Sequence, residues 1–139
     1  MKQQKALAST ILRVVLGITM LAHGIIKMQS GLDNIGGWFS SIGIPSFMAY
    51  IIAYFEVIGG AALIIGLLTR YVSAAFVIML LVALFKVKVA IGFTGDGQGA
   101  GWELDLALIA IAAYLTIRGS EGWSVDCLFG RARSAKSTN

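Results

Sequence analysis

The chain has 139 residues, of which 58% are hydrophobic and only 13% are charged, and its formal net charge is +4. Soluble domains are about half apolar and about a quarter charged, so the composition excludes an ordinary soluble domain and indicates a membrane protein. The basic excess does not indicate nucleic-acid binding, because the lysines and arginines flank the apolar stretches. Cys127 is the only cysteine, which excludes an intramolecular disulfide and a dithiol relay within one chain.

Four apolar stretches approach the length of about 20 residues that a membrane-spanning helix requires. We place them at about 9–28, 47–68, 71–91 and 101–118. Little sequence remains outside them, so we predict a single all-α domain over 1–139, an antiparallel bundle of four transmembrane helices with a tail, 119–139. Most lysines and arginines lie on the side that holds both termini, so the positive-inside rule places both termini and the tail in the cytoplasm.

The first stretch carries Arg13, His23 and Lys27, which interrupt the apolar run, so we interpret it as a retained span and not as a cleaved signal peptide. At about 100° per residue these three side chains share one helical face with Gly17 and Gly24. Small residues mark surfaces where membrane helices pack closely. This face is therefore predicted to lie inside the bundle.

The segment from 29 to 46 is predicted to be an irregular loop on the outer side, because it holds four glycines and Pro45. Trp38 and Phe39 lie within it. Tryptophan is common at the membrane–water boundary, which favours a role as an interfacial anchor. A lid over an outward-facing cavity is the alternative.

The later stretches also carry ionisable residues. Glu56 lies near the midplane of the second stretch and shares a face with small residues. These are Gly59, Gly60 and Gly66. In the third stretch, helical spacing directs Lys86 inward and leaves Lys88 to reach the outer headgroups. In the fourth, the spacing separates Glu103 from Asp105, and we favour Glu103 as the inward-facing acid.

Most of these ionisable side chains converge at one level in the outer half of the membrane, given a rise of about 1.5 Å per residue. A charge at such depth costs about 2.5–3.5 kcal/mol on insertion scales, so a residue of this kind is functional by default. A ligand or catalytic site is therefore favoured over a structural network of ion pairs. The candidate catalytic residues, which would exchange protons, are His23, Glu56 and Glu103. The candidate substrate-binding residues are Lys27, Lys86, Arg13, Tyr54 and Tyr114. No metal site is expected, because one histidine with scattered carboxylates and neighbouring lysines does not form a ligand set.

Three motifs, in their order and spacing, resemble the DoxX family over roughly residues 9–130. They are His23-Gly24-x-x-Lys27, Glu56-x-x-Gly59-Gly60-x-x-Leu63-x-x-Gly66-x-x-Thr69-Arg70, and the ending Gly122-Trp123-Ser124-Val125-Asp126. The resemblance implies a four-helix integral protein of the bacterial plasma membrane. The family includes a subunit of an archaeal thiosulfate:quinone oxidoreductase and a Bacillus member linked to catechol resistance. By this resemblance, the positions that match characteristic positions of the family are Arg13, His23, Lys27, Glu56, Arg70, Glu103, Ser124 and Asp126. The glycine-rich segment Gly95–Gly101 departs from the family pattern.

The leading expectation for function is a membrane oxidoreductase, or a subunit of a redox complex, that handles a quinone or catechol in detoxification or oxidative-stress defence. The sequence shows no flavin, haem or iron–sulfur motif, so we expect no encoded cofactor. A bound quinone is the group that the site would hold, and the electrons would come from the substrate or a partner. One alternative is a non-catalytic scaffold that docks a soluble redox enzyme at Arg70 and the basic tail, Arg131–Lys136. The other is a small transporter, which with four helices would require a homodimer.

Overall fold

A computed structural model of the chain describes residues 1–136, and the end of the predicted tail, 137–139, lies outside the described residues. The described part is helical and contains no strand. Its helices are α1 (Lys2–Ser30), α2 (Leu32–Ser41), α3 (Met48–Ile65), α4 (Thr69–Ala83), α5 (Trp102–Arg118) and α6 (Val125–Lys136). Helix α4 continues through a π-helical turn, η1 (Leu84–Lys88), and a 3-10 turn, η2 (Val89–Ile91). The all-α fold class is therefore confirmed.

Three helices are long and apolar enough to cross a membrane, judged by length and composition. They are α1, α3 and the continuous helix Thr69–Ile91, which match the first three predicted spans. Helix α5 occupies the fourth predicted span and has 17 residues. The structure thus confirms a membrane protein with three candidate spans, and the fourth crossing remains a prediction.

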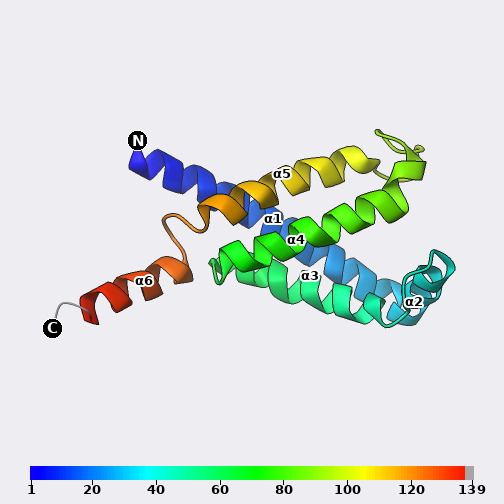
Figure 1. The fold of residues 1–139 in the computed structure, drawn as a ribbon, viewed down its shortest axis with the longest axis horizontal. Helices are drawn as coiled ribbons and strands as arrows, with labels where there is room; N and C mark the ends of the chain where they lie inside the picture. Colours follow the sequence, from blue (N-terminus) through cyan, green and yellow to red (C-terminus); the bar gives the residue numbers. More distant parts are fainter. Residues whose placement is uncertain (137–139) are drawn as a thin grey trace.

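The segment predicted as an irregular loop contains a helix, α2, so that prediction is wrong. Gly36 allows the backbone at Ser46 to pack directly against this helix. A Cβ on Gly36 would lie 2.9 Å from the carbonyl oxygen of Ser46. Phe39 is buried on the same helix. Packing against the preceding and following helices therefore outweighs the low helix propensity of glycine. Figure 1 shows α2 at the end of the bundle where α1 and α3 meet, which we call the α2 end.

The four long helices form two antiparallel pairs, α1 with α3 and α4 with α5 (Figure 1). Glycines allow the first pair to pack closely: a Cβ on Gly17 would lie 2.8 Å from the carbonyl oxygen of Gly60, and a Cβ on Gly60 would lie 2.7 Å from that of Gly17. Backbones approach this closely in membrane helices only through small residues. The predicted packed glycine face is confirmed.

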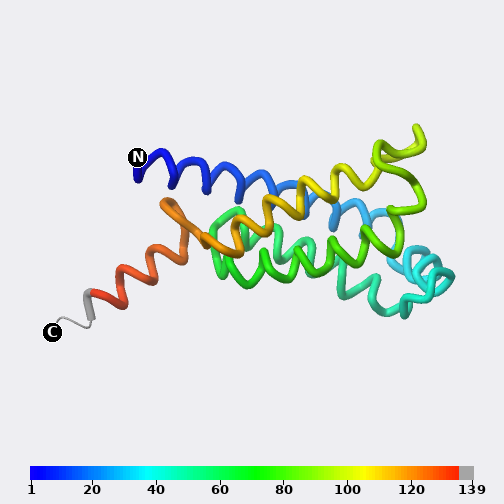
Figure 2. The backbone as a smooth tube through the Cα atoms, turned by 45° about the horizontal axis from the view of Figure 1, so that its top comes forward, coloured from blue at the N-terminus to red at the C-terminus, as the bar shows by residue number. Residues whose placement is uncertain are grey.

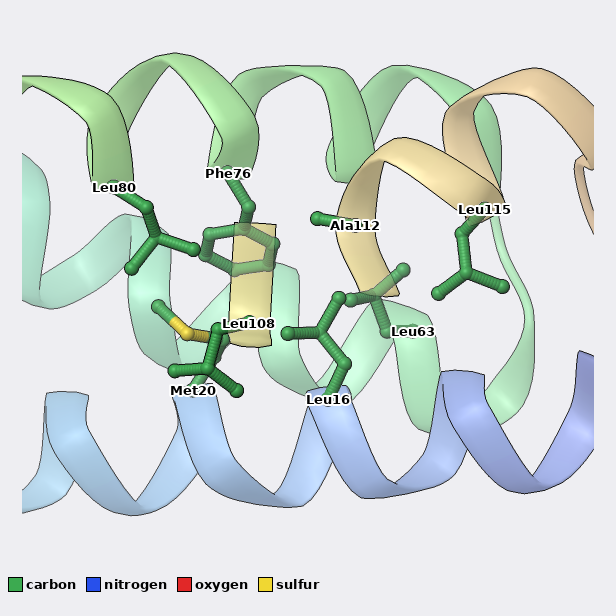
Figure 3. Close-up of a cluster of buried hydrophobic side chains, with 8 residues drawn as sticks. All are labelled: Leu16, Met20, Leu63, Phe76, Leu80, Leu108, Ala112 and Leu115. Carbon is green, nitrogen blue, oxygen red and sulfur yellow. The ribbon is translucent and has the colours of Figure 1, made fainter. Parts of the chain in front are cut away.

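A cluster of eight buried side chains joins the two pairs at the centre of the bundle (Figure 3). It comprises Leu16 and Met20 of α1, Leu63 of α3, Phe76 and Leu80 of α4, and Leu108, Ala112 and Leu115 of α5. Every member is at most 6% exposed. Because α5 contributes three members, it belongs to the same packed unit as the three candidate spans.

Helices α3 and α4 are joined by a tight turn and diverge from it toward the α2 end (Figures 1 and 2). The turn contains two left-handed residues, Gly66 (φ 76°) and Leu68 (φ 50°). Positive φ is uncommon for leucine. The Asp126 carboxylate stabilises this conformation, because it accepts hydrogen bonds from the backbone N–H groups of Leu68 (2.8 Å) and Thr69 (3.0 Å). We call this end of the bundle, with the turn and residues 119–126, the tail end.

Candidate functional site

A cavity of about 540 Å³ lies between the diverging helices α3 and α4, toward the α2 end of the bundle. This volume falls within the range of roughly 300–1,000 Å³ that is typical of small-molecule sites. Most of the wall is apolar, with contributions from α1 to α5 and from η1. Five ionisable side chains line it: His23, Lys27, Glu56, Lys88 and Asp105. Three of the predicted site residues, His23, Lys27 and Glu56, are therefore brought together.

The centre of the site is an ion pair between α1 and α3. The Nζ of Lys27 donates to the Oε1 of Glu56 at 2.5 Å, and the side chains are 28% and 3% exposed respectively. Close helix packing brings the two together: a Cβ on Gly24 would lie 2.9 Å from the backbone nitrogen of Val57. Lys27 is one turn after this contact on α1, so it reaches the adjacent turn of α3.

The second carboxylate oxygen of Glu56 is buried and has no hydrogen-bond partner within residues 1–136. Leaving a buried polar group unpaired costs about 1–3 kcal/mol, and more for a charged group. Because Glu56 also lines the cavity, a ligand that donates an O–H or N–H would satisfy this oxygen. The Glu56 carboxylate is therefore the candidate acceptor for a ligand that donates a hydrogen bond.

Asp105 is a second carboxylate at the cavity, in the first turn of α5. It is buried, and its side chain makes no hydrogen bond or ion pair with the part of the chain that the structure describes. The positive end of the α5 helix dipole stabilises a negative charge at this position. The exposed imidazole of His23 lines the cavity from α1. The arrangement thus combines two acids, an imidazole and two lysines that can hold or transfer protons.

Aromatic side chains form part of the wall: Trp38 and Phe39 of α2, and Phe55 of α3. The ring centroids of Trp38 and Phe39 lie 5.5 Å apart. A hydrogen bond from the Tyr50 hydroxyl to the Asp33 carboxylate ties α2 to α3. Trp38 and Phe39 therefore line the cavity, which is the position of the alternative role as a lid, whereas the favoured role as an interfacial anchor stays a prediction.

The structure contradicts the predicted orientation of the two lysines on the third span. Lys86 is exposed and does not line the cavity, whereas Lys88 lines it and donates from Nζ to the carbonyl oxygen of Ala100 at 3.0 Å. The reason is η1, because a π-helical turn contains more residues than an α-helical turn and changes the direction of the side chains that follow. Spacing at 100° per residue does not anticipate this change.

The structure also contradicts the predicted orientation of the two acids on the fourth span. Asp105 is buried in the cavity wall, whereas Glu103 is half-buried outside it. The buried face of α5 consists of Asp105, Leu108, Ala112 and Leu115. The sequence feature that indicates this orientation is the larger apolar residues on the Asp105 face. They fill the core better than the alanines that share a face with Glu103.

The remaining predicted substrate-binding residues do not line the cavity. Arg13 is buried at the tail end, where its Nη2 donates to the carbonyl oxygen of Trp123 at 2.6 Å. Tyr54 is exposed on α3, and Tyr114 packs against the central hydrophobic cluster. No group of three or more His, Cys, Asp or Glu side chains that could hold a metal ion occurs within residues 1–136.

Comparisons with known proteins place this fold and site in a family. The model of the DoxX family matches residues 8–89. A protein of Bacillus subtilis (strain 168) named "Putative oxidoreductase CatD" is 36% identical over 126 residues, which cover 91% of this chain and 90% of that protein. A protein of Mycobacterium tuberculosis (strain ATCC 25618 / H37Rv) named "Uncharacterized membrane protein Rv3486" is 29% identical over 126 residues, which cover 83% of this chain and 77% of that protein. No solved structure gives a significant match. The family match covers more than half of the chain and includes Lys27 and Glu56, so the chain belongs to the DoxX family.

Proposed function

We propose that this protein is a membrane oxidoreductase, or a subunit of a redox complex, that handles a quinone- or catechol-type molecule in detoxification or oxidative-stress defence. One observation carries the proposal: a buried carboxylate with an unpartnered oxygen, Glu56, lines an otherwise mostly apolar cavity with aromatic walls. A phenolic ring matches such a site, because it has an apolar face and an O–H donor at its edge. A relative whose name includes the word oxidoreductase supports the same class of activity.

The residues at the cavity fit the proton chemistry of this class. Oxidation of a catechol or quinol to the quinone releases two protons and two electrons. The unpartnered Oε2 of Glu56 accepts the hydrogen bond of a ring hydroxyl and can take its proton. Lys27, beside it, stabilises the negative charge that develops on the ring oxygen. His23 and Asp105 are the further proton acceptors at the cavity, in place of the predicted Glu103.

The electrons leave through an acceptor outside this chain, either a quinone of the membrane or a soluble redox partner. A bound quinone also fits the cavity. Lys27 and His23 can donate hydrogen bonds to its carbonyl oxygens. Such a group would supply two-electron redox chemistry. The chain's own part is to bind and orient the ring and to hold the protons.

We further propose that α5 forms the fourth crossing and that both termini lie in the cytoplasm of a bacterial cell. Two observations support this topology. Helix α5 runs antiparallel to α4 and buries three residues in the central cluster, and its 17 residues span about 26 Å, close to the hydrocarbon thickness of about 30 Å. The basic residues of α6, Arg131 and Arg133, then lie on the cytoplasmic side, as the positive-inside rule requires.

The test is ligand binding to purified protein in lipid nanodiscs, with Glu56→Gln compared with Glu103→Gln. Both substitutions remove one carboxylate from a helix of the bundle, but only Glu56 lines the cavity. With tryptophan fluorescence as the readout, Trp102→Phe and Trp123→Phe leave Trp38 as the only reporter, and a 1,4-benzoquinone with a decyl side chain quenches it on binding. The hydroquinone of the same compound, which donates hydrogen bonds, is titrated against the bound quinone, and we expect Glu56→Gln to weaken its binding by at least tenfold and Glu103→Gln by less than twofold. Equal affinities in folded variants would refute the proposal.

A second function, a membrane scaffold for a soluble redox enzyme, is favoured by the surface of α6. Leu128 and Phe129 are exposed on this helix beside Arg131 and Arg133, which suits a protein partner with an acidic and apolar face. In cells, deletion of residues 131–139 would then reduce catechol resistance more than Glu56→Gln does. A transporter is less favoured, because Met20, Leu80 and Leu108 belong both to the cavity wall and to the central cluster, which closes the cavity on that side.

A further inference from the structure

The cavity is open on the side where α3 and α4 diverge. Three aliphatic side chains line it and are also exposed: Ile51 of α3 (54%), and Ile78 (65%) and Val82 (49%) of α4. A side chain that both lines a cavity and is exposed to this degree lies at its mouth. We call these three residues the α3–α4 rim. The rim is entirely apolar.

The depth of the rim shows what the opening faces. Leu80 is the midpoint of the span Thr69–Ile91, and Ile78 and Val82 are each two residues from it, which corresponds to about 3 Å along the helix axis. Ile51 lies about 8 Å from the middle of α3. The hydrocarbon layer extends about 15 Å to each side of its centre. The rim therefore opens into lipid tails and not into water.

Helix α2 covers part of the route from the end of the bundle. Helix α2 crosses the α2 end, where Trp38 and Phe39 form part of the wall, and the hydrogen bond between Tyr50 and Asp33 fixes α2 to α3. On the opposite side, Met20, Leu80 and Leu108 of the central cluster, which Figure 3 shows, line the cavity and close it. The α3–α4 rim is thus an opening that neither α2 nor the cluster covers. His23 of α1 and Leu104 of α5 (38%) also line the cavity and are exposed.

We infer that the ligand is an amphipathic molecule dissolved in the membrane, which enters sideways between α3 and α4 with its polar head directed to Glu56. The cavity connects an aliphatic opening at hydrocarbon depth to a buried carboxylate, so the matching ligand has a small hydrogen-bonding head and an apolar tail. Within the proposed function, on which this inference rests, an alkyl-substituted quinone or catechol is the substrate class. A molecule confined to water does not reach the site by this route.

The test narrows the opening without changing the polar groups. Ile78→Phe with Val82→Phe places two aromatic rings in the rim, and Ile18→Phe with Ile58→Phe is the matched control, because Ile18 and Ile58 are exposed but do not line the cavity. Both pairs are made in the protein with Trp38 as the only tryptophan and reconstituted in nanodiscs. The probe is the decyl-substituted benzoquinone, and the rate of fluorescence quenching after stopped-flow mixing is measured.

We expect the rim variant to slow quenching by at least tenfold relative to the starting protein, and the control variant to change it by less than twofold. Unchanged rates in the rim variant, with hydroquinone binding still weakened by Glu56→Gln, would overturn entry through the rim and leave the proposed function standing. No saturable quenching in any variant, including the starting protein, would overturn the proposed function and this inference with it. A water-soluble sulfonated benzoquinone that binds as fast as the decyl compound would also overturn the lateral route.

Discussion

The Lys27–Glu56 ion pair should respond unequally to the removal of its two partners. The Glu56 side chain is 3% exposed and the Lys27 side chain 28%, so only the lysine has access to water if its partner is lost. Lys27→Met leaves a buried carboxylate without its cation, a change that typically costs about 3–5 kcal/mol. Glu56→Gln removes the buried charge and keeps an oxygen that accepts from Lys27, so we expect a cost of about 1 kcal/mol, the size of one hydrogen bond.

The double variant separates this reasoning from simple additivity. With both charges gone, no buried carboxylate remains unpaired, so Lys27→Met/Glu56→Gln should be less destabilised than the sum of the single variants by about 2 kcal/mol, within the range known for contacting pairs. The free energy of unfolding is measured in lipid–detergent micelles titrated with a denaturing detergent. Lys86→Met, at an exposed lysine, is the control and should stay within about 0.5 kcal/mol of the parent. Equal single effects that add in the double variant would refute the pairing of a buried carboxylate with Lys27.

Four further variants test other parts of the structure. Gly60→Ala places a Cβ 2.7 Å from backbone atoms of α1 and should destabilise the protein by about 1–3 kcal/mol in the same assay, whereas Gly37→Ala, with no neighbour within 4 Å, should be neutral or slightly stabilising. At Asp126, burial raises the pKa, but hydrogen bonds from Thr69, Leu68 and Ser120 outweigh it and lower the pKa below its ordinary value. Asp126 therefore contributes stability above the pKa of the unfolded aspartate and loses it as the pH falls through the lower folded pKa, so Tm should fall with acidification less steeply in Asp126→Asn than in the parent. Asp105→Asn should change the affinity for the decyl benzoquinone more than Glu103→Gln does, in nanodisc titrations.

Regular helical geometry accounts for what was predictable from sequence. A constant angle per residue correctly placed Gly17 and Gly60 on packed faces, because both lie in uninterrupted α-helix where the spacing holds. The same spacing placed Lys27 and Glu56 on inward faces, but it put Glu56 near the midplane and Lys27 at the outer boundary. The ion pair between them depends in addition on the close contact of α1 with α3 at Gly24. Composition indicated a membrane protein, and the length of the apolar stretches indicated the all-α class.

The errors arose where local geometry or packing changed that spacing. The π-helical turn exchanged the orientations of Lys86 and Lys88, and no residue within the turn indicates a π-helical conformation from sequence. The choice between Glu103 and Asp105 depended on which face of α5 carries the larger apolar residues, a packing criterion that charge and depth do not contain. Helix α2 formed in a glycine-rich segment because tertiary contacts of Gly36 and Phe39 stabilise it.

The tail end and the cavity are structurally coupled through α3 and α4, although they lie toward opposite ends of the bundle. Helices α3 and α4 diverge from their joining turn, so the geometry of the turn helps to set the width of the cavity between them. Three contacts hold this turn: the Asp126 carboxylate binds the N–H groups of Leu68 and Thr69, and the Asp126 N–H donates to the carbonyl oxygen of Gly66 at 3.0 Å.

Asp126→Ala removes the carboxylate that stabilises the left-handed conformation of Leu68. Leu68 can then leave this conformation, so α3 and α4 can change their angle at the turn. We therefore expect weaker binding of the decyl benzoquinone in this variant, although Asp126 does not line the cavity. Since no charge at the cavity is altered, the loss should be similar for ligands with different polar heads, whereas Glu56→Gln should discriminate between a hydroquinone, which donates hydrogen bonds, and the quinone, which does not. Nanodisc titrations of both ligands separate the two effects. An unchanged affinity in a folded Asp126→Ala variant would show that the width of the cavity is set by the central cluster and not by the turn.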